Sequence, residues 1–161
     1  MGLVPEWATG PKGVRIFNAR AESVHFKFTR VFREQRVVVP ATGFYEWTSV
    51  GKKKRARLFS GAGGEPFAMA GLLDCWGSGP ERVVATCLIT TKPNCLVAEV
   101  HDRMPVILPR EHYAEWLDPG TDEARFLELL RPYPAELMVA RDVGPTVNSS
   151  KNDSPACVAV V

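Results

Sequence analysis

The middle of the chain is a succession of short segments rich in β-branched and aromatic residues, divided by turn-forming residues. Such segments favour strands, and the Gly-, Ser- and Pro-rich stretches at 60–66 and 77–80 favour the turns between them. The expected strands are RVVVPATGFYEW with a turn at 40–43, RARLFS, PFAMAGLLDCW, RVVATCLITT and, later, AELMVARD. Strands joined by short connections pair in antiparallel fashion, so the core is expected to be a β-sheet.

Helices are expected at intervals around this sheet. FKFTRVFREQ (26–35) places Phe28, Val31 and Phe32 on one face. Pro109 is suited to start a helix over 110–117, with Tyr113, Trp116 and Leu117 on one face, and a further helix is expected over 121–130. The pattern predicts an α+β fold with an antiparallel, barrel-like β core and flanking helices, in a single domain over 1–161.

Several classes of protein do not fit the sequence. No run approaches the roughly 18 apolar residues of a membrane span, and no signal peptide pattern is present. Four cysteines, with no C-x-x-C pair, fit reduced thiols in a cytoplasmic protein. The three histidines share no ligand spacing with the cysteines, so we expect no metal and no cofactor.

The net charge of +2 is unevenly distributed. Residues 1–60 contain 12 Lys and Arg against 4 Asp and Glu, whereas the rest contain 8 against 14. Such an excess of basic residues, including Arg30, Arg33, Arg36 and the cluster at 52–55, favours a surface that faces a polyanion. The alternative is a solvated basic face with no partner.

Polar residues interrupt four segments that are otherwise apolar or turn-forming: NARAE, GFYEW, ITTKPN and HDRMP. Glu46 lies between Tyr45 and Trp47, and an apolar pocket would raise the pKa of its carboxyl, as suits a general acid or base. The alternative is an ion pair with Arg20 or Arg103. His101 is a residue type that transfers protons near neutral pH, although a lone histidine is often structural.

Together with VPATGFYEW, FAMAGLLDCW and PTVNSSKNDSP, these segments occur in the order and at about the spacing of one known family. The chain resembles the SOS-response-associated peptidases, also called abasic-site processing proteins. The resemblance implies an α+β barrel-like fold with a basic cleft. It also implies binding of single-stranded DNA and reaction with the ring-opened aldehyde of an abasic site. Such a protein would be nucleoid-associated when bound to DNA.

The resemblance also implies roles for individual residues. Asn18 matches an asparagine that orients the reacting amine and sugar, Glu46 a glutamate that shuttles protons, and His101 a histidine that helps to open the sugar ring. The residues that match DNA-contacting or cleft-lining positions are Arg20, Thr90, Thr91, Asn94 and Arg103. Asp102 and Arg103 are expected to pair locally or to contact phosphate, which would hold His101 in place.

The start of the chain departs from the family pattern. Members begin Met-Cys-Gly-Arg, and the amine and thiol of that cysteine close a thiazolidine on the aldehyde. Here Met1 stands where the family has a tryptophan, followed by Gly2, so the chain is expected to be truncated at its N-terminus. Three interpretations stay open: a crosslinking enzyme completed by an upstream cysteine, a noncovalent single-stranded-DNA-binding remnant, and a thiol autopeptidase.

Overall fold

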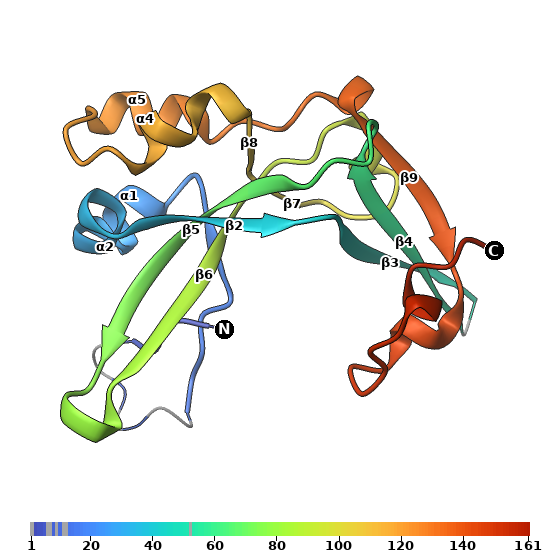
Figure 1. Cartoon of the computed structure of the whole chain (residues 1–161), viewed down its shortest axis with the longest axis horizontal. Helices are drawn as coiled ribbons and strands as arrows, with labels where there is room; N and C mark the ends of the chain where they lie inside the picture. Colours follow the sequence, from blue (N-terminus) through green and yellow to red (C-terminus); the bar gives the residue numbers. More distant parts are fainter. Residues whose placement is uncertain (1, 6–7, 9, 11–12, 52) are drawn as a thin grey trace.

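The computed structural model describes residues 2–5, 8, 10, 13–51 and 53–161 (Figure 1). Two β-sheets form the framework. The larger sheet has the order β1-β6-β5-β2, and two short strands pair with it off this path, β7 with β6 and β8 with β5. Its strands are β1 (Asn18–Arg20), β2 (Arg36–Ala41), β5 (Phe67–Trp76), β6 (Val83–Thr91), β7 (Met104–Pro105) and β8 (Ile107–Leu108). The smaller sheet has the order β3-β4-β9: β3 (Phe44–Val50), β4 (Lys53–Gly61) and β9 (Met138–Val143).

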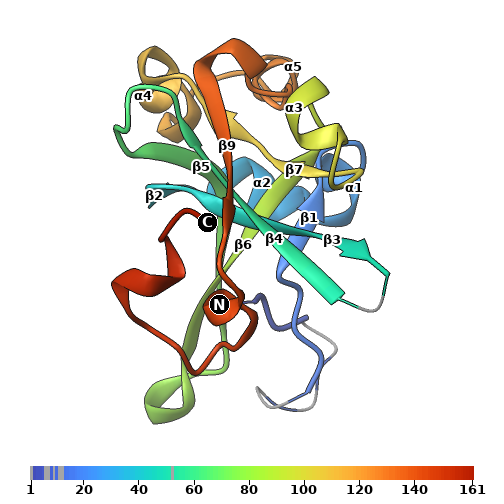
Figure 2. The same ribbon diagram turned by 90° about the vertical axis from the view of Figure 1, so that its right-hand side faces the viewer.

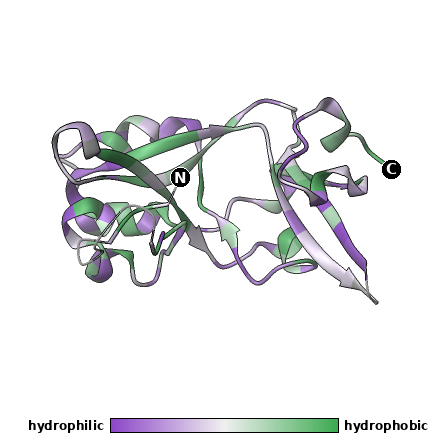
Figure 3. Ribbon diagram, turned by 90° about the horizontal axis from the view of Figure 1, so that it is seen from below, coloured by the Kyte–Doolittle hydropathy of each residue, from purple (hydrophilic) through white to green (hydrophobic). Residues whose placement is uncertain are grey.

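The chain passes from the larger to the smaller sheet between β2 and β3. Gly43 lies at this crossing, where a Cβ atom would come within 2.7 Å of the carbonyl oxygen of Phe59. Only glycine lets the two backbones approach so closely. Seen from below, the two sheets occupy opposite ends of an elongated molecule and are joined by extended segments (Figure 3).

The predicted α+β class and barrel-like β core are confirmed, and each predicted strand overlaps an observed one. One part of the topology differs from the expectation of an antiparallel core. β1 pairs with β6 in parallel, with Asn18 opposite Leu88 and Arg20 opposite Thr90. The 62 residues between β1 and β6 (21–82) pass through both sheets, which gives β1 the crossover that parallel pairing requires.

The segment MPVIL forms two short strands, β7 and β8, rather than one continuous strand. Val106 separates β7 from β8, since its amide donates to Ile89 (2.8 Å) and its carbonyl accepts from Ala70 (2.8 Å). β7 therefore pairs with β6 and β8 with β5. The segment is inserted where β5 and β6 diverge, and it is buried throughout.

Short helices cover one side of the larger sheet (Figure 1): α1 (Val24–Lys27), α2 (Thr29–Glu34), α4 (Tyr113–Leu117) and α5 (Glu123–Leu129). The helix expected over 26–35 is divided at Phe28, which has φ −131° and ψ 37°. The helix expected over 110–117 begins with the 3-10 turn η2 (Arg110–His112). The remaining short helical segments are α3 (Cys95–Ala98), η1 (Gly79–Glu81), η3 (Ala135–Leu137), η4 (Pro145–Asn148) and η5 (Pro155–Cys157).

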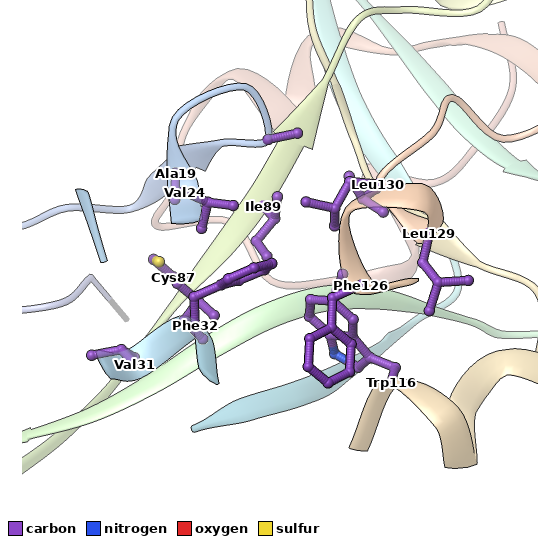
Figure 4. Close-up of a cluster of buried hydrophobic side chains, with 14 of the residues drawn as sticks. Ala19, Val24, Val31, Phe32, Cys87, Ile89, Trp116, Phe126, Leu129 and Leu130 are labelled. Atoms are coloured by element: carbon purple, nitrogen blue, oxygen red, sulfur yellow. The ribbon is translucent and has the colours of Figure 1, made fainter. Parts of the chain in front are cut away.

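Aromatic rings form the centre of the core between these helices and the sheet (Figure 4). Trp116 lies 6.2 Å from Phe32 and 5.8 Å from Phe126 between ring centroids. The predicted apolar face of the helix over 110–117 is partly wrong, because Leu117 remains 45% exposed. Trp116 alone supplies the fully buried contact from α4.

Arg36 enters this aromatic core. Its guanidinium carbon lies 3.5 Å from the centroid of the Phe126 ring. Its nitrogens donate to the carbonyl oxygens of Phe32 (2.7 Å), Trp116 (2.7 Å) and Asp118 (3.0 Å). These carbonyls lie at the ends of α2 and α4, where no helical partner is available. Arg36 therefore holds the two helices together.

A second cluster packs between the two sheets. Phe44 stacks on Phe59 at 5.2 Å between ring centroids, and Met69, Met104 and Ile107 complete this cluster from the larger sheet. Its position is important for function, because it fixes how the two sheets face each other.

Candidate functional site

A cavity of about 500 Å³ opens between β1 of the larger sheet and β3 of the smaller one. Its floor is apolar and belongs partly to the cluster between the sheets. Its lining residues are Asn18, Arg20, Phe44, Tyr45, Glu46, Met69, Leu88, Thr90, His101, Arg103, Met104 and Pro105. The cavity thus brings together six of the eight residues that the sequence singled out.

β1 supplies Asn18 and Arg20. Successive side chains of a strand point to opposite faces, so these two share one face and Ala19 takes the other. Ala19 is 2% exposed and packs in the helical core, which anchors the strand. The pairing with Leu88 and Thr90 of β6 then fixes both polar side chains at the cavity.

Glu46 enters the cavity from β3. Its side chain is 22% exposed, and burial is the main reason that the pKa of its carboxyl is raised. The nearby Asp102 raises this pKa further, whereas His101 opposes the shift. The alternative of an ion pair with Arg20 or Arg103 is not what the structure shows: among the described residues, the partner of Glu46 is His101, at 3.9 Å between Oε2 and Nε2.

His101 lies between α3 and β7, and both neighbouring elements hold it. Its backbone amide donates to Val97 at 3.0 Å. Its ring Nδ1 lies 2.9 Å from the backbone nitrogen of Arg103, which can only donate. The same Nδ1 lies 3.2 Å from the carbonyl oxygen of Arg103 and 3.3 Å from Asp102 Oδ1, so the turn holds this edge of the ring and leaves Nε2 facing Glu46.

Arg103 is held by several acceptors. Its Nη1 and Nη2 donate to the two carboxylate oxygens of Glu22 at 2.7 and 2.9 Å. Its Nη2 also donates to the carbonyl oxygen of Thr90 at 2.6 Å. Glu22 was not among the residues predicted for the site, although it ends the motif NARAE that contains Asn18 and Arg20.

Thr91 and Asn94 lie outside the lining of the cavity. Thr91 is 5% exposed, and its hydroxyl donates to the carbonyl oxygen of Leu130 at 3.0 Å. The Asn94 side chain caps α3 by accepting from the amide of Val97 (3.0 Å), and it donates to the carbonyl oxygen of Tyr133 (2.7 Å). Both side chains therefore serve internal hydrogen bonds.

Several arginines of the basic first third of the sequence have partners within the protein. Arg30 pairs with Asp74 (2.9 Å) and Arg33 with Glu123 (2.6 Å), whereas Arg36 is buried. Arginine ion pairs of this kind lower the charge that the surface presents to a polyanion. Arg20, by contrast, is exposed at the cavity.

The C-terminal segment covers the outer face of the smaller sheet (Figure 2). The Tyr45 hydroxyl donates to the carbonyl oxygen of Cys157 (3.3 Å), and the Trp47 indole donates to the Asn148 side chain (2.8 Å). The bond to Asn148 connects PTVNSSKNDSP to the strand that carries Glu46, and the bond to Cys157 connects the residues just after this motif. The late motif therefore supports β3, a strand that lines the cavity.

Neither a thiol nor a lysine amine lines the cavity among the residues described. Cys87 is buried in β6, and burial raises the pKa of its thiol to about 12. The backbone nitrogen of Gly2 donates to Thr86 at 2.7 Å. Because β6 rises by about 3.3 Å per residue, that contact lies about 13 Å along the strand from Thr90.

Two further properties hold for the part of the chain that the structure describes. No three His, Cys, Asp or Glu side chains are grouped so that they could bind a metal ion. None of its helices has the length and apolar character needed to cross a membrane.

The comparison with known families identifies the chain. The model of the SOS response associated peptidase (SRAP) family matches residues 1–150. The chain belongs to the SRAP family. The abasic site processing protein YoqW of Bacillus subtilis is 42% identical over 166 residues, which covers 98% of this chain and 73% of YoqW.

More distant SRAP relatives agree with this assignment. The abasic site processing protein HMCES of Xenopus tropicalis is 30% identical over 190 residues, covering 99% of this chain and 56% of HMCES. A crystal structure of a protein from Bacteroides thetaiotaomicron superposes with a TM-score of 0.90 at 31% identity. The superposition covers 99% of this chain and 74% of that protein, so the two-sheet framework of this SRAP chain is shared.

Proposed function

We propose that the cavity binds an abasic site in single-stranded DNA and supplies the proton transfers by which the site is processed. The observation that carries the proposal is the Glu46–His101 pair, in which Nε2 of the histidine faces a carboxyl of raised pKa. Arg20 and Asn18 stand at the same cavity with one cationic and one amide side chain. The names of YoqW and HMCES give the same substrate for those relatives.

Each residue has a task in this proposal. Arg20 contacts a phosphate, and Asn18 hydrogen-bonds the sugar, whose ring fits the apolar floor. Opening of the cyclic sugar breaks the bond between C1′ and the ring oxygen. A base takes the proton of the C1′ hydroxyl, and an acid protonates the ring oxygen. His101 and Glu46 carry out these two transfers, which leave an aldehyde at C1′.

The family resemblance implies a covalent sequel at this aldehyde. An amine adds to C1′, water leaves to give an imine, and a thiol on the adjacent carbon of the amine adds to the imine carbon while its proton passes to nitrogen. The product is a thiazolidine. Since no described residue offers both groups at the cavity, we propose that residues 1–161 provide DNA binding and proton transfer. The covalent step then needs an aminothiol of the kind that an N-terminal cysteine carries.

The dipeptide cysteinyl-glycine, added in solution, tests whether residues 1–161 provide the proton transfers when the aminothiol is supplied separately. It carries an α-amine and a thiol on adjacent carbons, as an N-terminal cysteine does. The chain is mixed with a single-stranded oligonucleotide that contains one abasic site, and thiazolidine formation on the DNA is followed by mass spectrometry with and without protein.

The parent chain is expected to accelerate this reaction, and Glu46→Gln and His101→Ala are each expected to remove most of the acceleration. Proton transfer by a placed side chain contributes about 10²–10⁴-fold. Glu65→Gln, at an exposed glutamate remote from the cavity lining, is the matched control. If the parent binds DNA but gives no acceleration, the chain is a noncovalent DNA-binding module and the catalytic proposal fails.

A further inference from the structure

The carboxylate of Glu22 and the guanidinium of Arg103 form a two-pronged ion pair at the edge of the cavity. The two N–H···O distances are 2.7 and 2.9 Å, and the Arg103 side chain is only 17% exposed. Parallel bonds of this kind fix the orientation of a guanidinium as well as its position. The hydrogen bond from Arg103 also lowers the pKa of the Glu22 carboxyl, which keeps it ionised at neutral pH.

The same guanidinium is fixed to β6. Its Nη2 donates to the carbonyl oxygen of Thr90 at 2.6 Å. Glu22 follows β1, Thr90 belongs to β6, and Arg103 precedes β7, so the arginine connects three segments at one end of the larger sheet. The side chain of Arg103 therefore helps to fix the backbone of the turn just before β7, where Met104 pairs with Thr91.

That backbone position is what holds the His101 ring. The Arg103 amide lies 2.9 Å from His101 Nδ1 and fixes the ring so that Nε2 faces Glu46. Asp102 lies between the two residues; its side chain is 86% exposed, and its Oδ1 lies 3.3 Å from His101 Nδ1. The orientation of the histidine thus depends in part on the ion pair between Arg103 and Glu22.

We infer that Glu22 is a positioning residue of this site: by pairing with Arg103 it holds the 101–103 turn and thereby the direction in which His101 presents Nε2 to Glu46. The effect of Glu22 on the orientation of the His101 ring does not depend on the proposed function, whereas its effect on catalysis rests on that function. Glu22 also pairs with the charge of Arg103 at the edge of the cavity that Arg20 lines.

Nuclear magnetic resonance tests the structural part without DNA. In the parent chain at pH 8.5, the Arg103 amide is expected to exchange slowly with solvent, and the His101 ring nitrogens are expected to report a hydrogen-bonded Nδ1. In Glu22→Gln and Glu22→Ala the Arg103 amide is expected to exchange about tenfold faster or more, as for a locally opened turn. The His101 Nδ1 signal moves toward that of free imidazole.

The matched control is Glu123→Gln, which breaks the ion pair with Arg33 (2.6 Å) outside the cavity lining. It is expected to leave both signals unchanged. Unchanged signals in the Glu22 variants would overturn the inference, whatever the protein does to DNA. If Glu22→Ala unfolds, the isosteric Glu22→Gln still gives the comparison.

The cysteinyl-glycine reaction tests the catalytic part. Glu22→Gln is expected to lower the protein-dependent rate about tenfold while the Kd for abasic DNA changes less than about threefold. A similar loss of rate and of affinity would place Glu22 in DNA binding and overturn its positioning role. If the parent chain gives no acceleration, the proposed function fails, and the two resonance measurements alone decide the inference.

Discussion

His101 and Glu46 face each other across the junction of the two sheets, with Nε2 and Oε2 3.9 Å apart. The histidine belongs to the larger sheet through the turn before β7, and the glutamate belongs to β3 of the smaller sheet. Their separation is therefore set by the apolar cluster that packs the sheets together. It exceeds a direct hydrogen bond, so a substrate oxygen between the two groups is the natural path for a proton.

The raised pKa of Glu46 predicts a pH-dependent gain in stability for Glu46→Gln. In the unfolded chain this carboxyl ionises near its ordinary value of 4.5, whereas in the folded chain burial keeps its proton to higher pH. The folded state then binds more protons, so the contribution of Glu46 to stability falls as pH rises from about 4.5 through the folded pKa. The glutamine variant has no such loss.

Urea unfolding of parent and variant at a series of pH values from 4 to 8 measures this effect. The stability of Glu46→Gln relative to the parent is expected to rise across the window and then to level off. Glu65→Gln, at an exposed carboxyl, provides the comparison for any general charge effect. A relative stability of Glu46→Gln that stays flat with pH would show that the carboxyl is not desolvated.

Arg20 predicts a specific change in the salt dependence of DNA binding. Each phosphate contact on a single strand contributes about −0.7 to the slope of log K against log salt concentration. Arg20→Ala is therefore expected to weaken binding of an oligonucleotide and to reduce the slope by about 0.7. Fluorescence anisotropy at several salt concentrations gives both quantities.

Arg33→Ala is the matched control, since Arg33 is exposed but paired with Glu123. Its slope is expected to remain near that of the parent. If the two substitutions changed the slope equally, DNA binding would depend on the general positive charge of the protein rather than on the cavity.

The hydrogen bonds of Arg36 predict that its substitution causes a large loss of stability, by a mechanism unrelated to DNA binding. Arg36→Ala leaves the carbonyl oxygens of Phe32, Trp116 and Asp118 without their donor. Each buried polar group left unsatisfied costs about 1–3 kcal/mol, so a total near 3 kcal/mol or more is expected in urea unfolding. Arg36→Lys retains the charge but not the planar fork, and is expected to recover only a small part.

The expected strands were predictable because their apolar patterns and turn residues are local properties of the sequence. The site was predictable as a set of motifs, and six of those residues line one cavity. What the sequence did not predict depends on contacts between distant segments. The parallel pairing of β1 with β6 and the Glu22–Arg103 clamp, 81 positions apart, are of this kind.

Of the sequence features, the distribution of charged residues was the least reliable guide to which side chains face a partner such as DNA. Arg30, Arg33 and Arg36 looked like one basic face, yet each finds a different partner: an acidic strand residue, an acidic helix residue and a set of carbonyl oxygens. A sequence shows how many charges lie in a segment. It does not show which of them the fold neutralises, because the neutralising groups come from elsewhere in the chain.

The last prediction concerns covalent chemistry by a polypeptide of the 161 printed residues: it forms no heat-stable adduct with abasic DNA. A thiazolidine needs an amine and a thiol on adjacent carbons of one residue. The four cysteines lie within the chain, where their α-nitrogens are amides, and burial raises the pKa of the Cys87 thiol to about 12. Lysine amines are mostly protonated at neutral pH, and an imine formed by one hydrolyses unless it is reduced.

The measurement is a denaturing gel of the chain incubated with uracil-glycosylase-treated single-stranded DNA, with and without borohydride. A shifted band is expected only with the reductant, which converts a transient imine into a stable amine. Cysteinyl-glycine is expected to modify the DNA while leaving the protein unattached. A heat-stable band without borohydride, mapped by mass spectrometry to a residue of 1–161, would show that a nucleophile within these residues replaces the N-terminal cysteine.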